Sequence, residues 1–248
     1  MTVRSHAMSI ARRQKMCAFT VALLAAAQTW ALEPKLQDSV DLDGDGKKEQ
    51  VTLEPGTEGH FSVRVGSTVY KGRVLTNEAQ GFTVVDVDAS EPRKELLVHT
   101  IGDVDEQHRV VLLRFDGKRL SELGTLQEAT EVKGNGIVLE DTWEGFWNRR
   151  EKYVLDARAQ KLTHVRQELL YVGIEGTVRS KSFPLQRTRT DTTPVANVAP
   201  GSKVLVVAAA TPDKDGPVEW YLLKTSTGLL GWARIQTLVD EVELPFAG

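Results

Sequence analysis

The chain is poor in cysteine, in aromatic residues and in long apolar runs. Cys17 is the only cysteine among 248 residues, and aromatic residues make up 6% of the chain. A chain with one cysteine forms no internal disulfide, so its stability has to come from a hydrophobic core, which a chain of this length is able to bury. No apolar run approaches the roughly 20 residues of a membrane-spanning helix. We therefore expect no transmembrane anchor.

The first 31 residues have the three parts of a secretory signal peptide. Basic residues come first, an apolar run from Met16 to Ala27 follows, and a small-residue exit ends at Ala31. This order is typical of a signal peptide, and a buried N-terminal helix is the less favoured alternative because the charges precede the run instead of lining one helix face. We expect cleavage near Ala31 and a periplasmic or secreted protein. A lipid anchor would need a cysteine just after the apolar run, whereas Cys17 lies at the start of that run, so we expect no lipid anchor.

The chain after the predicted leader carries excess negative charge. Cleavage removes four basic residues and no acidic ones, which takes the formal net charge from −3 to −7. Nucleic acid and anionic lipid both require a basic surface on the protein that binds them. We therefore expect neither as a partner.

Strand signals dominate the rest of the chain. Short β-branched or aliphatic runs bounded by Gly, Pro, Asp or Asn are typical of β-strands. Such runs lie at residues 50–53, 61–65, 82–87, 95–100 and 109–115. Asp116-Gly117 and Gly134-Asn135-Gly136 predict tight turns. Helix signals are weak: residues 120–130 have room for a short helical turn, but Gly124 interrupts it. The pattern predicts an all-β protein.

A change in composition divides this β-rich chain. The apolar strand around Tyr171 gives way to the polar stretch Arg179-Ser180-Lys181-Ser182. We place a domain boundary there. The predicted organisation is therefore a signal peptide at residues 1–31, a first β domain at 32–178 and a C-terminal domain at 179–248.

The sharpest local motif is the carboxylate alternation Asp41-Leu42-Asp43-Gly44-Asp45-Gly46-Lys47-Lys48-Glu49. Alternate positions of a tight loop turn their oxygens toward a common centre, and Ca²⁺ takes about six to eight oxygen ligands. The pattern begins like an EF-hand loop, but Thr52 stands where that loop has a bidentate Glu, and a strand follows instead of a helix. The alternative is a solvated turn held by side-chain-to-backbone hydrogen bonds.

A carboxylate loop that runs directly into a strand resembles the calcium loop of FG-GAP repeats, found in integrin-type β-propellers and many bacterial exported proteins. The resemblance implies Ca²⁺ ligands at Asp41, Asp43, Asp45 and Glu49, with the backbone carbonyl of Lys47. A weaker copy at residues 86–95 has lost the middle aspartate and the glycine, so we assign the metal to the first loop. Two copies are too few for a propeller, so we expect a small FG-GAP-like β-sheet domain.

The last sixty or so residues, from Phe183 onward, resemble a bacterial SH3-like domain. The resemblance rests on Gly201 before an aliphatic strand, on Trp220 at the start of the next strand and on the pair Gly231-Trp232. It implies a small SH3-like barrel that contacts peptidoglycan or an envelope protein. Trp220 and Trp232 are then candidate ligand contacts, with a place in the barrel core as the alternative.

A second candidate surface lies at Trp143-Glu144-Gly145-Phe146-Trp147, where three rings fall within five residues. Exposed rings beside polar groups bind sugars or peptides, so Trp143, Phe146 and Trp147 are candidate ligand contacts. The alternative is a hairpin end whose rings cap the β core. Glu140 or Glu144 beside Trp143 and Trp147 also leaves open an envelope glycan hydrolase that uses a carboxylate as acid.

No further catalytic motif accompanies these residues. The chain has no Gly-x-Ser-x-Gly elbow, Walker loop or His-Glu-x-x-His motif, and its one cysteine lies in the leader. The sequence therefore predicts a non-catalytic exported binding or interaction protein with a structural calcium loop. A glycan hydrolase and a purely structural protein are the alternatives.

Overall fold

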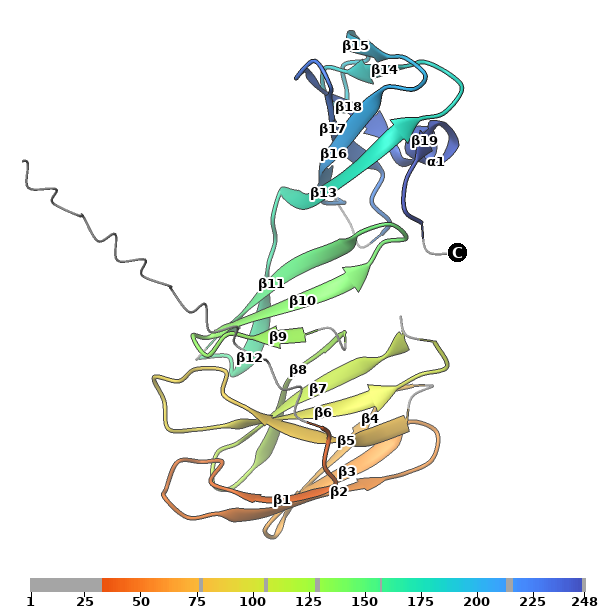
Figure 1. Cartoon of the computed structure of the whole chain (residues 1–248). Helices are drawn as coiled ribbons and strands as arrows, with labels where there is room; N and C mark the ends of the chain where they lie inside the picture. Colours follow the sequence, from red (N-terminus) through yellow and green to blue (C-terminus); the bar gives the residue numbers. More distant parts are fainter. Residues whose placement is uncertain are drawn as a thin grey trace, which may run out of the picture. The chain divides into compact units, whose positions relative to one another are not determined.

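The computed structural model describes residues 33–75, 78–104, 107–127, 130–156, 158–212 and 216–246. These residues form four antiparallel sheets and one short helix (Figure 1), so the predicted all-β class is confirmed. The predicted signal peptide, residues 1–31, lies outside the described residues. Within the described ranges, no helix is long and apolar enough to cross a membrane.

The first three sheets are four-stranded meanders, in which strands adjacent in the chain are also adjacent in the sheet. Their strand orders are β1-β2-β3-β4, β5-β6-β7-β8 and β12-β11-β10-β9. The strands are β1 (Gln37–Val40), β2 (Glu49–Pro55), β3 (His60–Val65), β4 (Thr68–Arg73), β5 (Glu78–Val85), β6 (Glu95–Ile101), β7 (Arg109–Phe115), β8 (Leu120–Gln127), β9 (Thr130–Val132), β10 (Ile137–Trp143), β11 (Asn148–Asp156) and β12 (Lys161–Val165).

The second meander is buried on both of its faces. Leu96 and Leu113 belong to a core shared with the first meander, whereas Leu97 and Leu112 belong to a core shared with the third. Successive residues of a strand point to opposite faces, so a strand between two other sheets reads as a continuous apolar run. This is why β6 and β7 are the most apolar runs of the first domain.

The short helical turn considered for residues 120–130 does not form over residues 120–127, because these residues form the strand β8. Its register against β7 changes between Leu112, opposite Gly124, and Leu113, opposite Glu122, so Leu123 occupies a β-bulge. The extra residue lets Leu123 and Leu126, three positions apart, both be buried. A bulge therefore produced the helix-like spacing of leucines.

The C-terminal module comprises one seven-stranded sheet and a helix. Its strand order is β15-β14-β18-β17-β16-β13-β19. The elements are β13 (Leu169–Val178), β14 (Phe183–Gln186), β15 (Pro194–Val198), β16 (Lys203–Ala210), β17 (Trp220–Thr225), β18 (Leu230–Arg234), α1 (Ile235–Glu241) and β19 (Val242–Glu243). The sheet thus includes β13, which precedes the boundary predicted at residue 179. A Cβ atom on Gly231 would lie 2.6 Å from Cβ of Leu185, so the close approach of β14 and β18 requires glycine there.

The tip of the β10–β11 hairpin belongs to the core of the C-terminal module. Phe146 and Trp147 are 1% and 2% exposed and pack in the same cluster as Tyr221 and Leu238. The Phe146 and Tyr221 ring centroids are 5.6 Å apart, and Trp147 Nε1 donates a hydrogen bond to the Tyr221 hydroxyl at 3.3 Å. The third meander and the C-terminal module therefore share side chains.

Trp147→Ala should lower the free energy of unfolding by about 3 to 5 kcal/mol, because it empties a large buried site and leaves the Tyr221 hydroxyl without its donor. Urea unfolding followed by circular dichroism measures this change. Leu230→Ala, which removes a half-exposed side chain, is the matched control and should change stability by less than about 0.5 kcal/mol. Equal effects of the two substitutions would contradict the shared core.

Candidate functional site

The carboxylate loop connects β1 to β2 and draws three of its four carboxylates together. One oxygen from each of Asp41, Asp43 and Glu49 lies within 4.8 Å of the others. The two Asp41 oxygens accept hydrogen bonds from the backbone N–H groups of Gly44, at 2.8 Å, and Gly46, at 2.9 Å. The loop is thus closed by its first residue. This arrangement is the oxygen-rich cluster that a hard divalent cation would use.

The other two predicted ligands lie at the exposed side of the loop. The Asp45 carboxylate accepts the backbone N–H of Lys47 at 2.8 Å and forms an ion pair with Lys47 Nζ at 3.2 Å. The hydrogen bond from the Lys47 backbone N–H lowers the pKa of Asp45. Asp45 is not in the cluster formed by Asp41, Asp43 and Glu49, so this structure groups three of the four predicted carboxylates.

The loop is seated against the second meander. Leu42 is fully buried, and its carbonyl accepts the backbone N–H of Lys94 at 3.0 Å. Asp43 Oδ2 lies 2.7 Å from the point where a Cβ atom on Gly117 would be, so the β7–β8 turn passes directly beside the cluster. A cation bound here would therefore hold the β1–β2 loop in place beside its neighbouring sheet.

The second copy of the motif, at residues 86–95, has the same hydrogen bond, and an arginine pairs with its glutamate. Glu49 Oε2 accepts the Leu42 N–H at 2.8 Å, and Glu95 Oε2 accepts the Val87 N–H at 3.0 Å. The other Glu95 oxygen accepts two hydrogen bonds from Arg114, at 2.8 Å from Nε and 2.6 Å from Nη2. Both side chains are at least 95% buried. In this copy the guanidinium of Arg114 neutralises the charge of the glutamate.

The first copy has no such arginine. Arg114 stands opposite Glu95 in the β6–β7 ladder. In the β2–β3 ladder Val51 stands opposite Val65, and when this register is continued by two residues, Ser67 in the β3–β4 turn is the position opposite Glu49. Among the described residues, no ion pair joins a basic side chain to Asp41, Asp43 or Glu49. The negative charge of this cluster is therefore not neutralised by an ion pair within the described chain.

The aromatic segment at residues 143–147 divides between core and surface. Trp143 is 39% exposed, whereas Phe146 and Trp147 are buried. Burial raises the pKa of their neighbour Tyr221 to about 12. Phe146 and Trp147 therefore have no open ring face for a ligand, in contrast to the predicted ligand contact. The alternative, rings that cap a β core, describes these two residues.

The two carboxylates considered as acids are held by neighbouring groups. Glu140 is 7% exposed, and its oxygens accept the Gln127 N–H at 2.6 Å and the Tyr153 hydroxyl at 2.7 Å. Glu144 forms an ion pair with Arg149 at 3.1 Å, and burial raises the pKa of Glu144. The hydrogen bonds to the two oxygens of Glu140 thus connect β10 to β8 and to β11.

Trp220 and Trp232 lie on the same face of the β17–β18 ladder, and each lies beneath an arginine. The Arg234 guanidinium is 4.8 Å from the Trp220 ring centroid, and that of Arg189 is 5.8 Å from the Trp232 ring centroid. Both distances suit cation–π contacts. Both rings are partly exposed, as a ligand contact requires.

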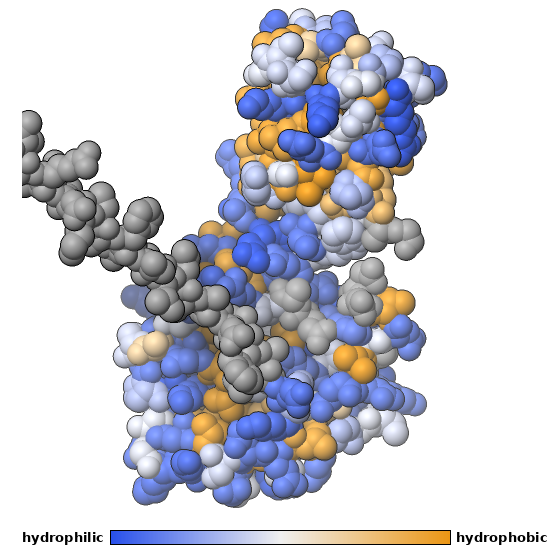
Figure 2. All heavy atoms as spheres, in the orientation of Figure 1, coloured by the Kyte–Doolittle hydropathy of each residue, from blue (hydrophilic) through white to orange (hydrophobic). Residues whose placement is uncertain are grey.

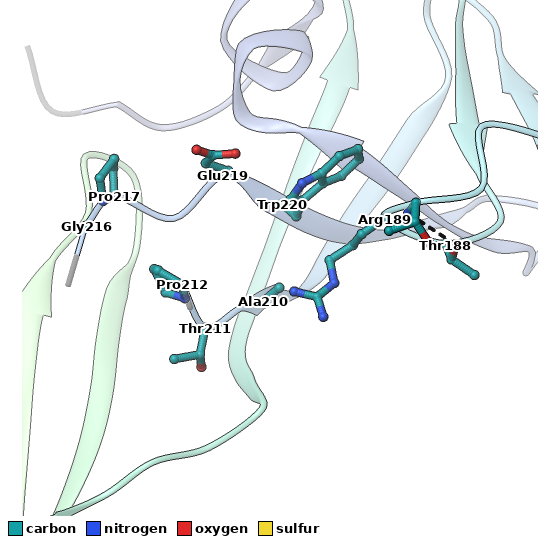
Figure 3. A pocket seen from close by; sticks show the side chains of 10 residues that line it. Thr188, Arg189, Ala210, Thr211, Pro212, Gly216, Pro217, Glu219 and Trp220 are labelled. Carbon is teal, nitrogen blue, oxygen red and sulfur yellow. Dashed lines mark hydrogen bonds between the residues drawn. The ribbon is translucent and has the colours of Figure 1, made fainter. Parts of the chain in front are cut away.

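A pocket of about 660 Å³ opens beside this face, and Figure 3 shows Arg189, Glu219 and Trp220 around it. Apolar side chains also reach the surface of the C-terminal module (Figure 2), where Leu229 and Leu230 are half exposed. The sequence identified Trp220 through its place in the motif. It did not identify Arg189, which precedes β15 and reaches the site only in the folded chain.

Arg114→Met should lower the free energy of unfolding by about 3 to 5 kcal/mol, because Glu95 would be left charged and buried without a partner. Thermal and urea unfolding measure the loss. Arg150→Met removes a bidentate but exposed ion pair with Asp141 and should cost no more than about 1 kcal/mol. A loss for Arg114→Met no larger than that of Arg150→Met would show that the Glu95 carboxylate does not need this cation.

Comparison with known proteins gives no family for the chain. No protein-family model, no curated protein and no solved structure matches it. A functional proposal therefore depends on the chain's own residues and their geometry.

Proposed function

We propose that this chain is a non-catalytic exported binding protein. Its first β domain holds a structural Ca²⁺ in an FG-GAP-like loop, and its SH3-like C-terminal module contacts peptidoglycan or an envelope protein. The observation that carries the proposal is the convergence of the Asp41, Asp43 and Glu49 carboxylates within 4.8 Å of one another. Export rests on the leader sequence, and the lack of a recognisable catalytic motif favours binding over catalysis.

The dimensions and chemistry of the cluster favour calcium. Ca²⁺ binds oxygens at about 2.3 to 2.6 Å, so two oxygens on one ion lie no more than about 5 Å apart, which the three carboxylates satisfy. All three residues are partly exposed, so water is able to complete the coordination. Asp45 and the Lys47 carbonyl are the further ligands in the FG-GAP-like arrangement, and Asp45 would have to turn away from Lys47 to join them.

The second copy of the motif supports a structural role for the ion. There, Arg114 neutralises the glutamate that follows the loop. In the first copy a calcium ion would supply the same positive charge and would fix the loop beside Gly117 and Lys94. The ion would then have a structural role, in which it keeps the loop of the first sheet packed beside the second sheet. No catalytic step would depend on it.

Calcium should bind the chain without residues 1–31 and raise its stability, by about 2.7 kcal/mol when free Ca²⁺ is 100 times the Kd. Calorimetric titration and thermal unfolding with and without EDTA measure both effects. Asp43→Asn combined with Glu49→Gln keeps the side-chain shapes but removes two charges and should abolish them. Asp88→Asn, in the second loop, is the matched control and should leave them intact. An absence of heat and of stabilisation in the unsubstituted chain would refute the calcium site.

Two arginine side chains favour an anionic partner for the C-terminal module. Arg189 and Arg234 present two guanidinium groups beside two partly exposed indole rings, and guanidinium groups form strong hydrogen bonds with carboxylates. Peptidoglycan is a polymer that carries carboxylates, and an exported protein encounters it. The pocket beside Trp220 then receives a carboxylate-bearing part of the polymer.

The chain should sediment with purified peptidoglycan, and Arg189→Ala combined with Trp220→Ala should reduce its retention to that of an unrelated protein. Val239→Ala, which removes an exposed side chain on α1 of the same module, is the control and should be retained like the unsubstituted chain. Retention of the unsubstituted chain no higher than that of the unrelated protein would rule out the contact with peptidoglycan.

A further inference from the structure

A groove separate from the two sites above lies between the β10–β11 hairpin and β13. Its volume is about 670 Å³, within the roughly 300 to 1,000 Å³ typical of small-molecule sites. Phe146 and Trp147, whose rings are buried, are among the residues at its base. Because these rings belong to the core, one side of the groove is rigid. Neither the carboxylate loop nor Trp220 contributes to it.

The groove contains two of the three exposed aromatic side chains of the described residues. Tyr171 is 78% exposed and Trp143 is 39% exposed, and both line the groove. The third, Phe246, packs edge-on against Phe146 with ring centroids 5.2 Å apart. Large apolar side chains that stay uncovered at one place mark binding surfaces more often than isolated ones do. Trp143 and Tyr171 therefore have ring faces that a ligand is able to cover.

The exposed Tyr171 ring lies over the backbone of Gly173. The chain has a β-bulge between Tyr171 and Ile174, where Gly173 has φ of +72°. A Cβ atom on Gly173 would lie 2.5 Å from the Tyr171 hydroxyl oxygen, so the ring lies back over the glycine. A side chain at residue 173 would displace it. The bulge thus positions Tyr171 at the edge of the groove.

Planar polar groups stand beside the two rings. Asp141 and Arg150 face each other across the β10–β11 ladder and form a bidentate pair, 2.8 Å from Nε to Oδ1 and 2.6 Å from Nη2 to Oδ2. Their charges cancel, and both keep free hydrogen-bonding capacity because Arg150 is 55% exposed and Asp141 is 24% exposed. The amides of Asn148 and Gln167 also line the groove, and an amide offers both donors and acceptors.

We propose that this groove binds a neutral glycan chain. The C–H faces of sugar rings would stack on Trp143 and Tyr171, and sugar hydroxyls, which both donate and accept, would pair with the Asp141–Arg150 pair and the two amides. A charged peptide fits less well, because the ion pair is already neutralised internally and Lys152 is the one further charged side chain among the described lining residues. This groove shares no lining residue with the pocket of the proposed peptidoglycan contact at Trp220.

Calorimetric titration of the whole chain with two soluble neutral oligosaccharides, the β-1,4-linked tetramers of N-acetylglucosamine and of glucose, tests this inference. At least one should bind with a saturable isotherm, and Tyr171→Ala and Trp143→Ala should each weaken that binding at least tenfold. Gly173→Ala, which displaces the Tyr171 ring, should weaken it too while thermal unfolding verifies that the variant is folded. Val69→Ala, which removes an exposed side chain on β4 outside both pockets, is the control and should bind like the unsubstituted chain.

Several outcomes would overturn the inference. These are the absence of binding by both tetramers, binding that Tyr171→Ala and Trp143→Ala leave unchanged, and tighter binding of an acidic or basic peptide that the same substitutions abolish. The titration is repeated in EDTA, where binding should persist. Because the tetramers carry no carboxylate, a failure here leaves the calcium and peptidoglycan proposals standing, and their failure leaves this one standing.

Discussion

The burial of the second meander on both faces is the constraint on which the first three sheets depend. β6 and β7 send alternate residues into two separate cores, one shared with the first meander and one with the third. A strand in this position has no face for a charged side chain unless that charge is paired. Glu95 is nevertheless at the start of β6, fully buried, and the structure keeps it there through Arg114 and the Val87 N–H.

This constraint connects the two carboxylate loops. Each loop leads into a strand whose first glutamate accepts a backbone N–H from the loop, at Leu42 in one copy and Val87 in the other. The second glutamate is inside the stack and has its own arginine. The first lies at the partly exposed end of the first meander, where Asp41 and Asp43 add negative charge instead of an arginine. The two copies thus share one hydrogen bond from the loop backbone to the glutamate, and they differ in charge, because Arg114 pairs with the second glutamate and no described basic side chain pairs with the first.

The β10–β11 hairpin has a comparable double role, because its side chains contribute both to a core and to a surface groove. Phe146 and Trp147 at its tip complete the core of the C-terminal module. The opposite side chains of the same hairpin, Trp143, Asp141 and Arg150, are left at the surface, where β13 adds Tyr171. One hairpin therefore attaches the module and forms one wall of the groove. The module includes β13 and the hairpin tip as well as the residues after 179.

The sequence by itself determined the all-β class, the strands β2, β3, β6 and β7 and the turns at Gly117 and Gly134, because period-two patterns and glycines that need positive φ are local properties. It also determined the carboxylate loop, since the carboxylates of that loop lie close together in the chain. Only the tertiary structure decided that Leu123 lies in a bulge, that Phe146 and Trp147 are buried, that Arg114 pairs with Glu95 and that Tyr171 lies beside Trp143. Each of these features depends on which strands become neighbours. Packing between residues far apart in the chain sets their burial and pairing, and no local sequence pattern encodes it.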